Sequence, residues 1–174
     1  MRSERDQLSA KISSPVILFF GLSGCGKSHV GQLVSALSGR FFYDADEDVT
    51  PAMRAALAAQ QPFTDAMRDE FFALMAQRIA ELQREYGELV VTQAVYKQQH
   101  RDYLKAQVSG LELVYVDSDE RAINQRVAAR AQGISLASAA ALRADFELPE
   151  SGVKRIQNDG DEQRIIQQLN RLYP

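Results

Sequence analysis

The stretch that decides the fold is PVILFFGLSGCGKS, residues 15–28. Pro15 to Leu22 is apolar at almost every position, which predicts a short strand buried on both faces. Gly21 to Ser28 matches the pattern G-x-x-x-x-G-K-[ST] at every specified position. Apolar residues then recur at helical spacing over residues 27–37, so an amphipathic helix is expected next. A buried strand, a glycine-rich loop and a helix form the context in which this pattern binds phosphate.

Each residue type in the loop suits the phosphates of a nucleotide. The three glycines allow positive φ angles and close approach, so consecutive amide groups can point at one anion. The helix N-terminus adds its dipole at the same point. Lys27 supplies a mobile cation for the β- and γ-phosphates, and the Ser28 hydroxyl can bind Mg²⁺. We therefore predict a nucleotide-binding set of Gly21, Gly24, Cys25, Gly26, Lys27, Ser28 and His29.

Cys25 admits two interpretations. A thiol at a helix N-terminus can have a lowered pKa and become reactive. The interpretation we favour is a small residue that fills space in the loop. His29 is expected on the surface of the following helix.

Length and composition indicate one globular domain. The chain has 174 residues, of which 45% are hydrophobic and 25% charged. A net charge of −3 disfavours non-specific binding to nucleic acid or to an anionic membrane, so neither partner is expected. One cysteine and two histidines exclude a disulfide framework, a four-cysteine zinc site and a histidine-rich metal site. The apolar run from Val16 to Leu22 is too short for a membrane span, so the expected location is cytoplasmic.

Strands and helices alternate along the chain. Helices are expected at 27–37, 51–59, 64–86, 97–108, 118–130 and 161–172, and residues 1–14 form a lead-in or a short helix. The segment 132–141 is small and polar, and we assign it no element. The pattern predicts an α/β fold of three layers, in which a five-stranded parallel sheet carries helices on both faces. Ligands of such sheets bind beyond the carboxyl ends of the strands. The strands are expected at 15–22, 41–46, 88–93, 111–116 and 154–157.

Two aspartates end the second predicted strand. Asp44 and Asp46 are two residues apart, which puts both side chains on one side if the strand persists that far. One carboxylate could help to hold Mg²⁺ or its water, and the other could accept a proton from a substrate hydroxyl. The alternative interpretation is an acidic turn, which is very common. Following a phosphate-binding loop, the pair is predicted to be functional.

Two arginines suit a mobile lid. Arg126 and Arg130 are four residues apart near the end of a predicted helix, so they share one face. Guanidinium groups stabilise the charge that spreads over phosphoryl oxygens during transfer. A solvated helix C-terminus, where cations offset the helix dipole, is the alternative. The small lid is expected at about residues 131–146.

Further cations are ambiguous on the sequence alone. Arg68 lies in the first turn of the long predicted helix, just off its apolar stripe, and could clamp a substrate carboxylate. A surface arginine beside Asp65 and Asp69 would look the same. Arg101 is similarly ambiguous, and most such charges are solvated.

These residues together resemble a known family. The chain is similar to the small-molecule kinases of the P-loop superfamily, which include gluconokinase, shikimate kinase and the nucleoside monophosphate kinases, and it looks most like gluconokinase. The resemblance covers about Pro15 to Pro149. It is carried by residues 21–28, Asp44-Ala45-Asp46, residues 62–68, Lys97 with Arg101-Asp102, residues 126–130 and residues 147–149.

The resemblance implies an ATP- and Mg²⁺-dependent kinase that phosphorylates a hydroxyl of a sugar acid. It also implies a possible homodimer, because small kinases of this type often dimerise. By this likeness, Lys27, Asp46, Arg126 and Arg130 are the catalytic residues, and Ser28 and Asp44 hold the metal. The small-molecule acceptor would be bound by Asp44, Asp46, Arg68 and Lys97. Residues 1–174 would form a single P-loop kinase domain.

The chain departs from the family in the acceptor-handling segments. Thr50-Pro51 stands where the family has His-Pro, Gln132-Gly133-Ile134 replaces Gly-His-Phe, and no tryptophan is present. Ala94-Val95-Tyr96-Lys97 replaces Ser-Ala-Leu-Lys. The acceptor therefore stays open: shikimate or a nucleoside monophosphate are alternatives to gluconate. A nucleotide-gated regulatory module with little turnover is a third possibility.

Overall fold

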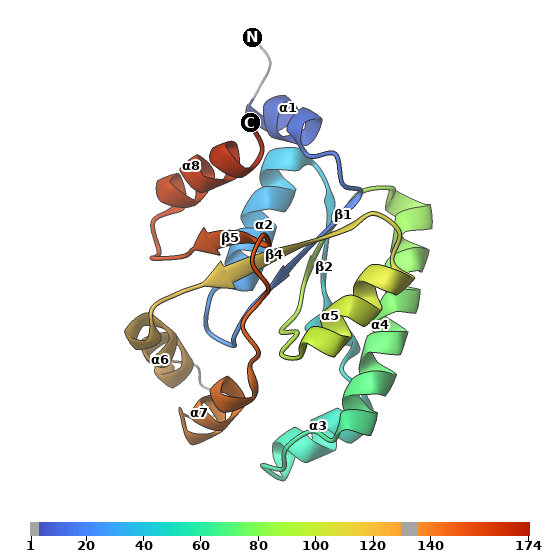
Figure 1. The fold of residues 1–174 in the computed structure, drawn as a ribbon, viewed down its shortest axis with the longest axis vertical. Helices are drawn as coiled ribbons and strands as arrows, with labels where there is room; N and C mark the ends of the chain where they lie inside the picture. The colour runs from blue at the N-terminus through green and yellow to red at the C-terminus, as the bar shows by residue number, and fades with distance from the viewer. Residues whose placement is uncertain (1–3, 130–135) are drawn as a thin grey trace.

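Five parallel strands form one sheet in the computed structural model, which describes residues 4–129 and 136–174 (Figure 1). The strand order is β2-β3-β1-β4-β5. Because β1, which precedes the phosphate-binding loop, lies in the middle of the sheet, the loop leaves the sheet at its centre. The strands are β1 (Val16–Phe20), β2 (Phe41–Asp44), β3 (Leu89–Thr92), β4 (Leu111–Asp117) and β5 (Lys154–Gln157).

Helices cover both faces of the sheet. Alternate residues of β1 enter two separate hydrophobic clusters: Val16 and Leu18 pack on the side of α4 and α5, and Ile17 and Phe19 on the side of α2 and α8. The predicted fold, three layers with a five-stranded parallel sheet buried on both faces, is therefore confirmed. The helices are α1 (Glu4–Lys11), α2 (Lys27–Ser38), α3 (Pro51–Ala58), α4 (Asp65–Tyr86), α5 (Gln98–Gln107), α6 (Glu120–Ala129), α7 (Leu136–Asp145) and α8 (Glu162–Leu172).

The longest helix begins and ends where its sequence signals predict. The Thr64 hydroxyl accepts a hydrogen bond from the Met67 amide at 3.2 Å and caps α4. Gly87 follows Tyr86 with a φ of 80°, a conformation that stops the helix and that glycine adopts at little cost. Its buried side chains are Arg68, Phe71, Phe72, Met75, Ala76, Ile79 and Leu82. Leu74 is 43% exposed, whereas Phe72 packs into the core.

Two expectations about local structure were wrong. The second strand ends at Asp44 rather than Asp46, because the Asp44 carboxylate accepts a hydrogen bond from the Asp46 amide at 3.0 Å and opens a 3-10 helix, Ala45–Asp48. The strand-based argument for placing both aspartates on one side therefore fails. The segment 132–141 was assigned no element, yet α7 covers its residues from Leu136 on. The first part of that segment, with Arg130, lies outside the described residues.

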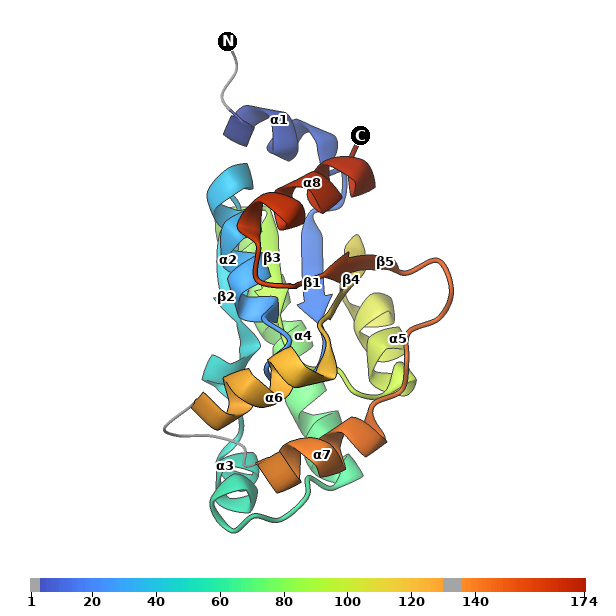
Figure 2. The ribbon, with the colours of Figure 1, turned by 90° about the vertical axis from the view of Figure 1, so that its left-hand side faces the viewer.

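The phosphate-binding loop leaves the sheet at the carboxyl ends of the strands. In Figure 2, α6, α7 and α3 lie beyond these ends, and α1 and α8 lie at the opposite end. Within the part of the chain that the structure describes, no helix combines the length and apolar character needed to cross a membrane.

Candidate active site

The loop from Gly21 to Ser28 joins the end of β1 to the start of α2. Gly24 and Gly26 have φ angles of 85° and 86°, which L-residues with side chains rarely adopt. A Cβ atom at Gly26 would also lie 2.0 Å from the Asn158 side-chain nitrogen. The loop geometry therefore fits a cradle of main-chain amides at a helix N-terminus, as the phosphates of ATP require.

Two side chains from neighbouring elements bind this loop, and a third connects them. Asn158, which follows β5, donates a hydrogen bond from Nδ2 to the Cys25 carbonyl at 2.9 Å. The Ser118 hydroxyl donates to the Asn158 carbonyl at 2.7 Å. Arg126 in α6 donates from Nη1 to the Gly24 carbonyl at 3.0 Å and to the Ser118 hydroxyl at 3.2 Å. Arg126 thus lies against the phosphate-binding loop itself.

Asn158 was missed by the sequence analysis, and no signal there pointed to it. A single asparagine after a short strand looks like an ordinary turn residue. Its contact with Cys25 joins positions 133 residues apart, so only the folded chain reveals it.

Cys25 is a packing residue rather than a nucleophile. Its side chain is 1% exposed, and burial raises the pKa of the thiol more than nearby Lys27 lowers it. This supports the favoured interpretation that Cys25 fills space in the loop. His29 is exposed on α2, as expected.

Ser28 and Asp44 are brought together by the fold. The Ser28 hydroxyl donates to Asp44 Oδ2 at 3.3 Å, which links the start of α2 to the end of β2. A hydroxyl and a carboxylate are hard oxygen ligands of the kind that Mg²⁺ prefers, so the pair fits the predicted metal site. Across the described residues, no three His, Cys, Asp or Glu side chains gather to hold an ion on their own.

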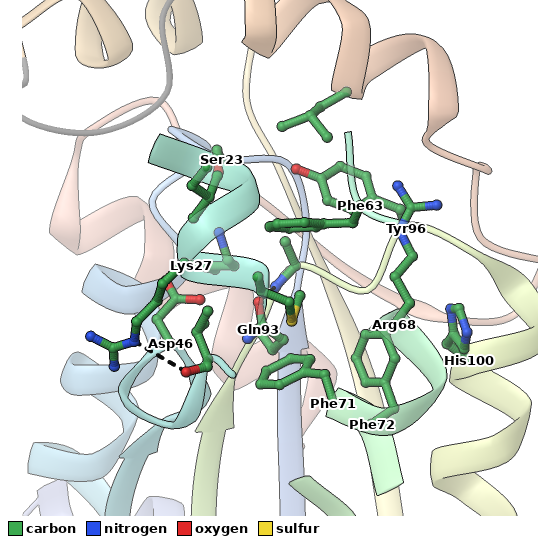
Figure 3. Close-up of a pocket in the computed structure, with 16 residues that line it drawn as sticks. Ser23, Lys27, Asp46, Phe63, Arg68, Phe71, Phe72, Gln93, Tyr96 and His100 are labelled. Atoms are coloured by element: carbon green, nitrogen blue, oxygen red, sulfur yellow. Dashed lines mark hydrogen bonds between the residues drawn. The ribbon is translucent and has the colours of Figure 1, made fainter. Parts of the chain in front are cut away.

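A cavity of about 380 Å³ opens beside the loop (Figure 3). Lys27 and Asp46 lie at one end of it, and Arg68 and His100 lie at the other. Ser23, Arg54 and Gln93 are its remaining polar lining residues. The apolar lining residues are Val49, Met53, Leu57, Phe63, Phe71, Phe72, Ala94 and Leu142, and Tyr96 contributes a ring that also carries a hydroxyl.

Arg68 is a buried cavity residue and not a solvated surface charge. It is 7% exposed, and its Nη2 lies 3.5 Å from Asp145 Oδ2. Its Nη1 lies 3.9 Å from Asp65 Oδ1. Asp145 is the last residue of α7, so the ion pair joins this helix to α4 across the edge of the cavity.

Lys97 lies beside the cavity but is not one of its lining residues. It precedes α5, and its Nζ lies 3.9 Å from Glu147 Oε1. The other oxygen of Glu147 accepts a hydrogen bond from the Gln98 amide at 2.8 Å. Lys97 and Glu147 therefore connect the start of α5 to the chain that leaves α7.

Arg101, which was ambiguous on the sequence alone, is a buried residue and not a solvated charge. It is 1% exposed and donates hydrogen bonds to the carbonyls of Val95, Tyr96 and Glu147. Its guanidinium also lies 4.6 Å from the centre of the Phe20 ring. Three carbonyls and an aromatic face replace the water that this charge loses on burial.

His100 was not singled out from the sequence. Its Nε2 lies 2.8 Å from Asp69 Oδ1, and its ring stacks on Phe72 with centroids 4.7 Å apart. Its Nδ1 is buried and has no hydrogen-bond partner among the described residues. A single histidine in the predicted helix 97–108 gave no signal of this position.

Comparison with known proteins agrees with this geometry. A protein-family model described as "AAA domain" matches residues 16–149. The chain belongs to this AAA domain family. The match covers the phosphate-binding loop, the cavity residues and α7, whereas Asn158 lies beyond its end.

Relatives of the chain include named kinases. A gluconokinase of Gluconobacter oxydans (strain 621H) is 24% identical over 158 residues, which span 91% of this chain and 84% of that protein. The solved structure of a sugar kinase from Janibacter sp. HTCC2649 has a TM-score of 0.79 at 22% identity and covers 91% of this chain and 94% of its own. That of a gluconokinase from Sinorhizobium meliloti 1021 has a TM-score of 0.76 at 23% identity, covering 92% and 94%. The fold is that of P-loop small-molecule kinases, as the resemblance implied.

Proposed function

We propose that this protein is an ATP-dependent kinase that phosphorylates a hydroxyl of a small carboxylated acceptor. The observation that carries the proposal is one continuous site. Lys27 of the phosphate-binding loop and Asp46 line the same cavity as the buried Arg68. Such a transfer needs a cation that binds the phosphates of the donor, a proton acceptor and a group that binds the acceptor's carboxylate. Lys27, Asp46 and Arg68 fit these three roles in that order. Gluconate is the first acceptor to test, because named relatives are gluconokinases.

The residues have separate tasks in this reaction. The loop amides and Lys27 hold the β- and γ-phosphates, and Asp46 accepts the proton of the acceptor hydroxyl. The acceptor oxygen forms a bond to the γ-phosphorus while the bond from that phosphorus to the β–γ bridging oxygen breaks. The products are the phosphate ester, ADP and a proton. Ser28 and Asp44 would hold Mg²⁺, which would supply positive charge to offset that of the phosphate oxygens.

Arg126 and the lid complete the proposal. Arg126 Nη1 donates a hydrogen bond to the Gly24 carbonyl of the loop. A small movement of α6 would therefore bring its guanidinium to the phosphates. We assign the whole chain to one kinase domain with a lid at about residues 131–146. Support comes from α7, which lines the cavity through Leu142 and pairs with Arg68 through Asp145. Arg143 ties the same helix to α6. Arg130 stays a prediction.

The test is ADP release from Mg·ATP with and without gluconate and other hydroxy acids, including shikimate. We expect acceptor-dependent ADP release that Lys27→Ala abolishes. Gln32→Ala, at an exposed position on the same helix, is the matched control and should keep full activity. Acceptor-independent ADP release that is equal in the two variants would contradict the proposal.

A regulatory module is the second candidate, and the changed acceptor segments favour it. Arg126→Ala separates the two functions. A kinase should lose rate by about 10³-fold or more with little loss of ATP affinity, because the guanidinium acts in the transition state. A nucleotide-gated module would lose ATP affinity instead.

A further inference from the structure

The cavity has polar groups at each end, and aromatic rings line much of the space between them. Figure 3 shows Lys27 and Asp46 on one side and Arg68 and His100 on the other. Phe63 lies on one wall, and Phe71 and Phe72 lie on the opposite wall. These three rings come from α4 and from the loop that precedes it. A ligand that spans the two ends must pass between aromatic surfaces.

The protein itself uses part of the hydrogen-bonding capacity of the polar side chains that line the cavity. Gln93 Oε1 accepts a hydrogen bond from the Ala94 amide at 2.7 Å. Arg54 donates from Nε to the Val49 carbonyl at 3.2 Å, and His100 uses Nε2 for Asp69. These contacts reduce the hydrogen-bonding capacity that is left for a ligand along the walls.

A polyol fits such walls poorly. Gluconate carries a hydroxyl on every carbon between its two ends, and each hydroxyl that faces a phenyl ring loses its hydrogen bonds to water. A buried hydroxyl without a partner opposes binding, whereas a ring of the same length buries apolar surface. Aromatic rings also pair favourably with one another in tilted or offset arrangements.

We infer that the acceptor is an anionic alcohol whose hydroxyl and carboxylate are separated by an apolar ring. The hydroxyl would lie at Asp46 and the carboxylate at Arg68, with the ring between Phe63 and the Phe71–Phe72 pair. This inference rests on the proposed kinase function and narrows its acceptor class. It differs from the sugar-acid acceptor that the relatives suggest.

Three probes test the acceptor class. Along the shortest path, gluconate and 4-(hydroxymethyl)benzoate have the same number of carbons from the carboxyl carbon to the hydroxymethyl carbon. Between these ends gluconate has hydroxylated carbons, whereas the benzoate has a phenyl ring. The uncharged 4-(hydroxymethyl)benzamide tests the anionic end. For each probe, kcat/KM is measured with Mg·ATP, and binding is measured by calorimetry in the presence of ADP. We expect kcat/KM and affinity for the benzoate to exceed those for gluconate by about tenfold or more, and the amide to bind weakly.

A wall variant identifies the cause of this preference. Phe63 is only partly buried, so Phe63→Asn should fold, which a thermal melt checks. We expect it to lower benzoate affinity about tenfold and to change gluconate affinity by less than about twofold. Phe63→Leu should keep most of the preference. Leu74→Asn, at an exposed position on α4, should change neither affinity.

The outcomes separate this inference from the kinase proposal. Tighter binding and faster transfer with the benzoate support both. Tighter binding of the benzoate without transfer supports the ring-bearing ligand and contradicts the kinase. Faster transfer to gluconate than to the benzoate, or a preference unchanged by Phe63→Asn, overturns the inference and leaves the kinase standing. If neither gluconate nor the benzoate binds or is phosphorylated, the inference is overturned for this cavity.

Discussion

The phosphate-binding half and the proposed acceptor-binding half of the site are built in different ways. The first is a contiguous stretch, Gly21 to Ser28, whose work is done by main-chain amides and two side chains. The second collects side chains from the β2–α3 region, α4, the β3–α5 connection and α7. A short motif can fix backbone geometry within itself, whereas a cavity depends on how distant elements pack. The first half is therefore expected to tolerate fewer changes than the second.

Gly26→Ala is expected to impair phosphate binding most strongly. The substitution strains a φ of 86° and puts a Cβ atom 2.0 Å from the Asn158 nitrogen that holds the Cys25 carbonyl. We expect kcat/KM for ATP to fall about 10³-fold or more, because the amide cradle must distort. Calorimetry with ATP and steady-state kinetics measure the loss.

Gly39→Ala is the matched control for that prediction. Gly39 also has a positive φ, 73°, but a Cβ there would meet no atom within 4 Å. We expect a stability loss of about 1–2 kcal/mol and an unchanged ATP affinity. Equal ATP affinities for the two variants would show that backbone strain at Gly26 does not control phosphate binding.

Asp46 tests whether the two halves meet in one reaction. Asp46→Asn removes the proposed proton acceptor, so kcat should fall about 10²–10⁴-fold while the KM for ATP stays within about twofold. Glu47→Gln, the exposed neighbour on the same 3-10 helix, should have little effect. A KM effect without a kcat effect would assign Asp46 to acceptor binding alone.

The contrast between the halves also explains what the sequence could predict. The loop, the Thr64 cap, the Gly87 stop and the Ser28–Asp44 pairing follow from local signals or from strand ends at one edge of a parallel sheet. Arg101 could not be placed, since its carbonyl partners lie on a loop and on a segment 46 residues away. The burial of Arg68 depends on α7, for which residues 132–141 gave no helical period. Asp46 was misplaced because Asp44 caps a 3-10 helix through its own side chain.

Arg68 is the sharpest test of the acceptor half. Arg68→Gln should raise the KM for carboxylate acceptors about 10- to 100-fold and leave the KM for ATP unchanged, because hydrogen bonds to a charged group are lost. Because Arg68 is buried, a thermal melt in the presence of ADP checks that the variant is folded. An equal rise for the carboxylate and its uncharged amide would show that Arg68 shapes the cavity rather than binding the anion.

Asp145 should affect the same half in the opposite direction. Its carboxylate lies 3.5 Å from Arg68 Nη2, where it competes with an acceptor carboxylate for the guanidinium. We expect Asp145→Asn to lower the KM for carboxylate acceptors about two- to fivefold, since the Arg68 charge is then freer. A raised KM would mean instead that Asp145 orients Arg68 for its ligand.

The smallest expected effect returns to the phosphate-binding half. Cys25 contributes its backbone to the cradle and its side chain to packing, so Cys25→Ala should keep kcat within about twofold and lower stability by about 1 kcal/mol.

Because burial raises the thiol pKa, the folded state favours the neutral thiol. Wild-type stability should therefore fall as pH rises above about 9, where the unfolded thiol ionises first, and Cys25→Ala should lack this component of the fall. Denaturant melts of both proteins across this pH range measure the difference. Identical pH profiles would show that the thiol ionises as readily in the folded loop as in the unfolded chain, and fast alkylation of folded wild type would confirm it.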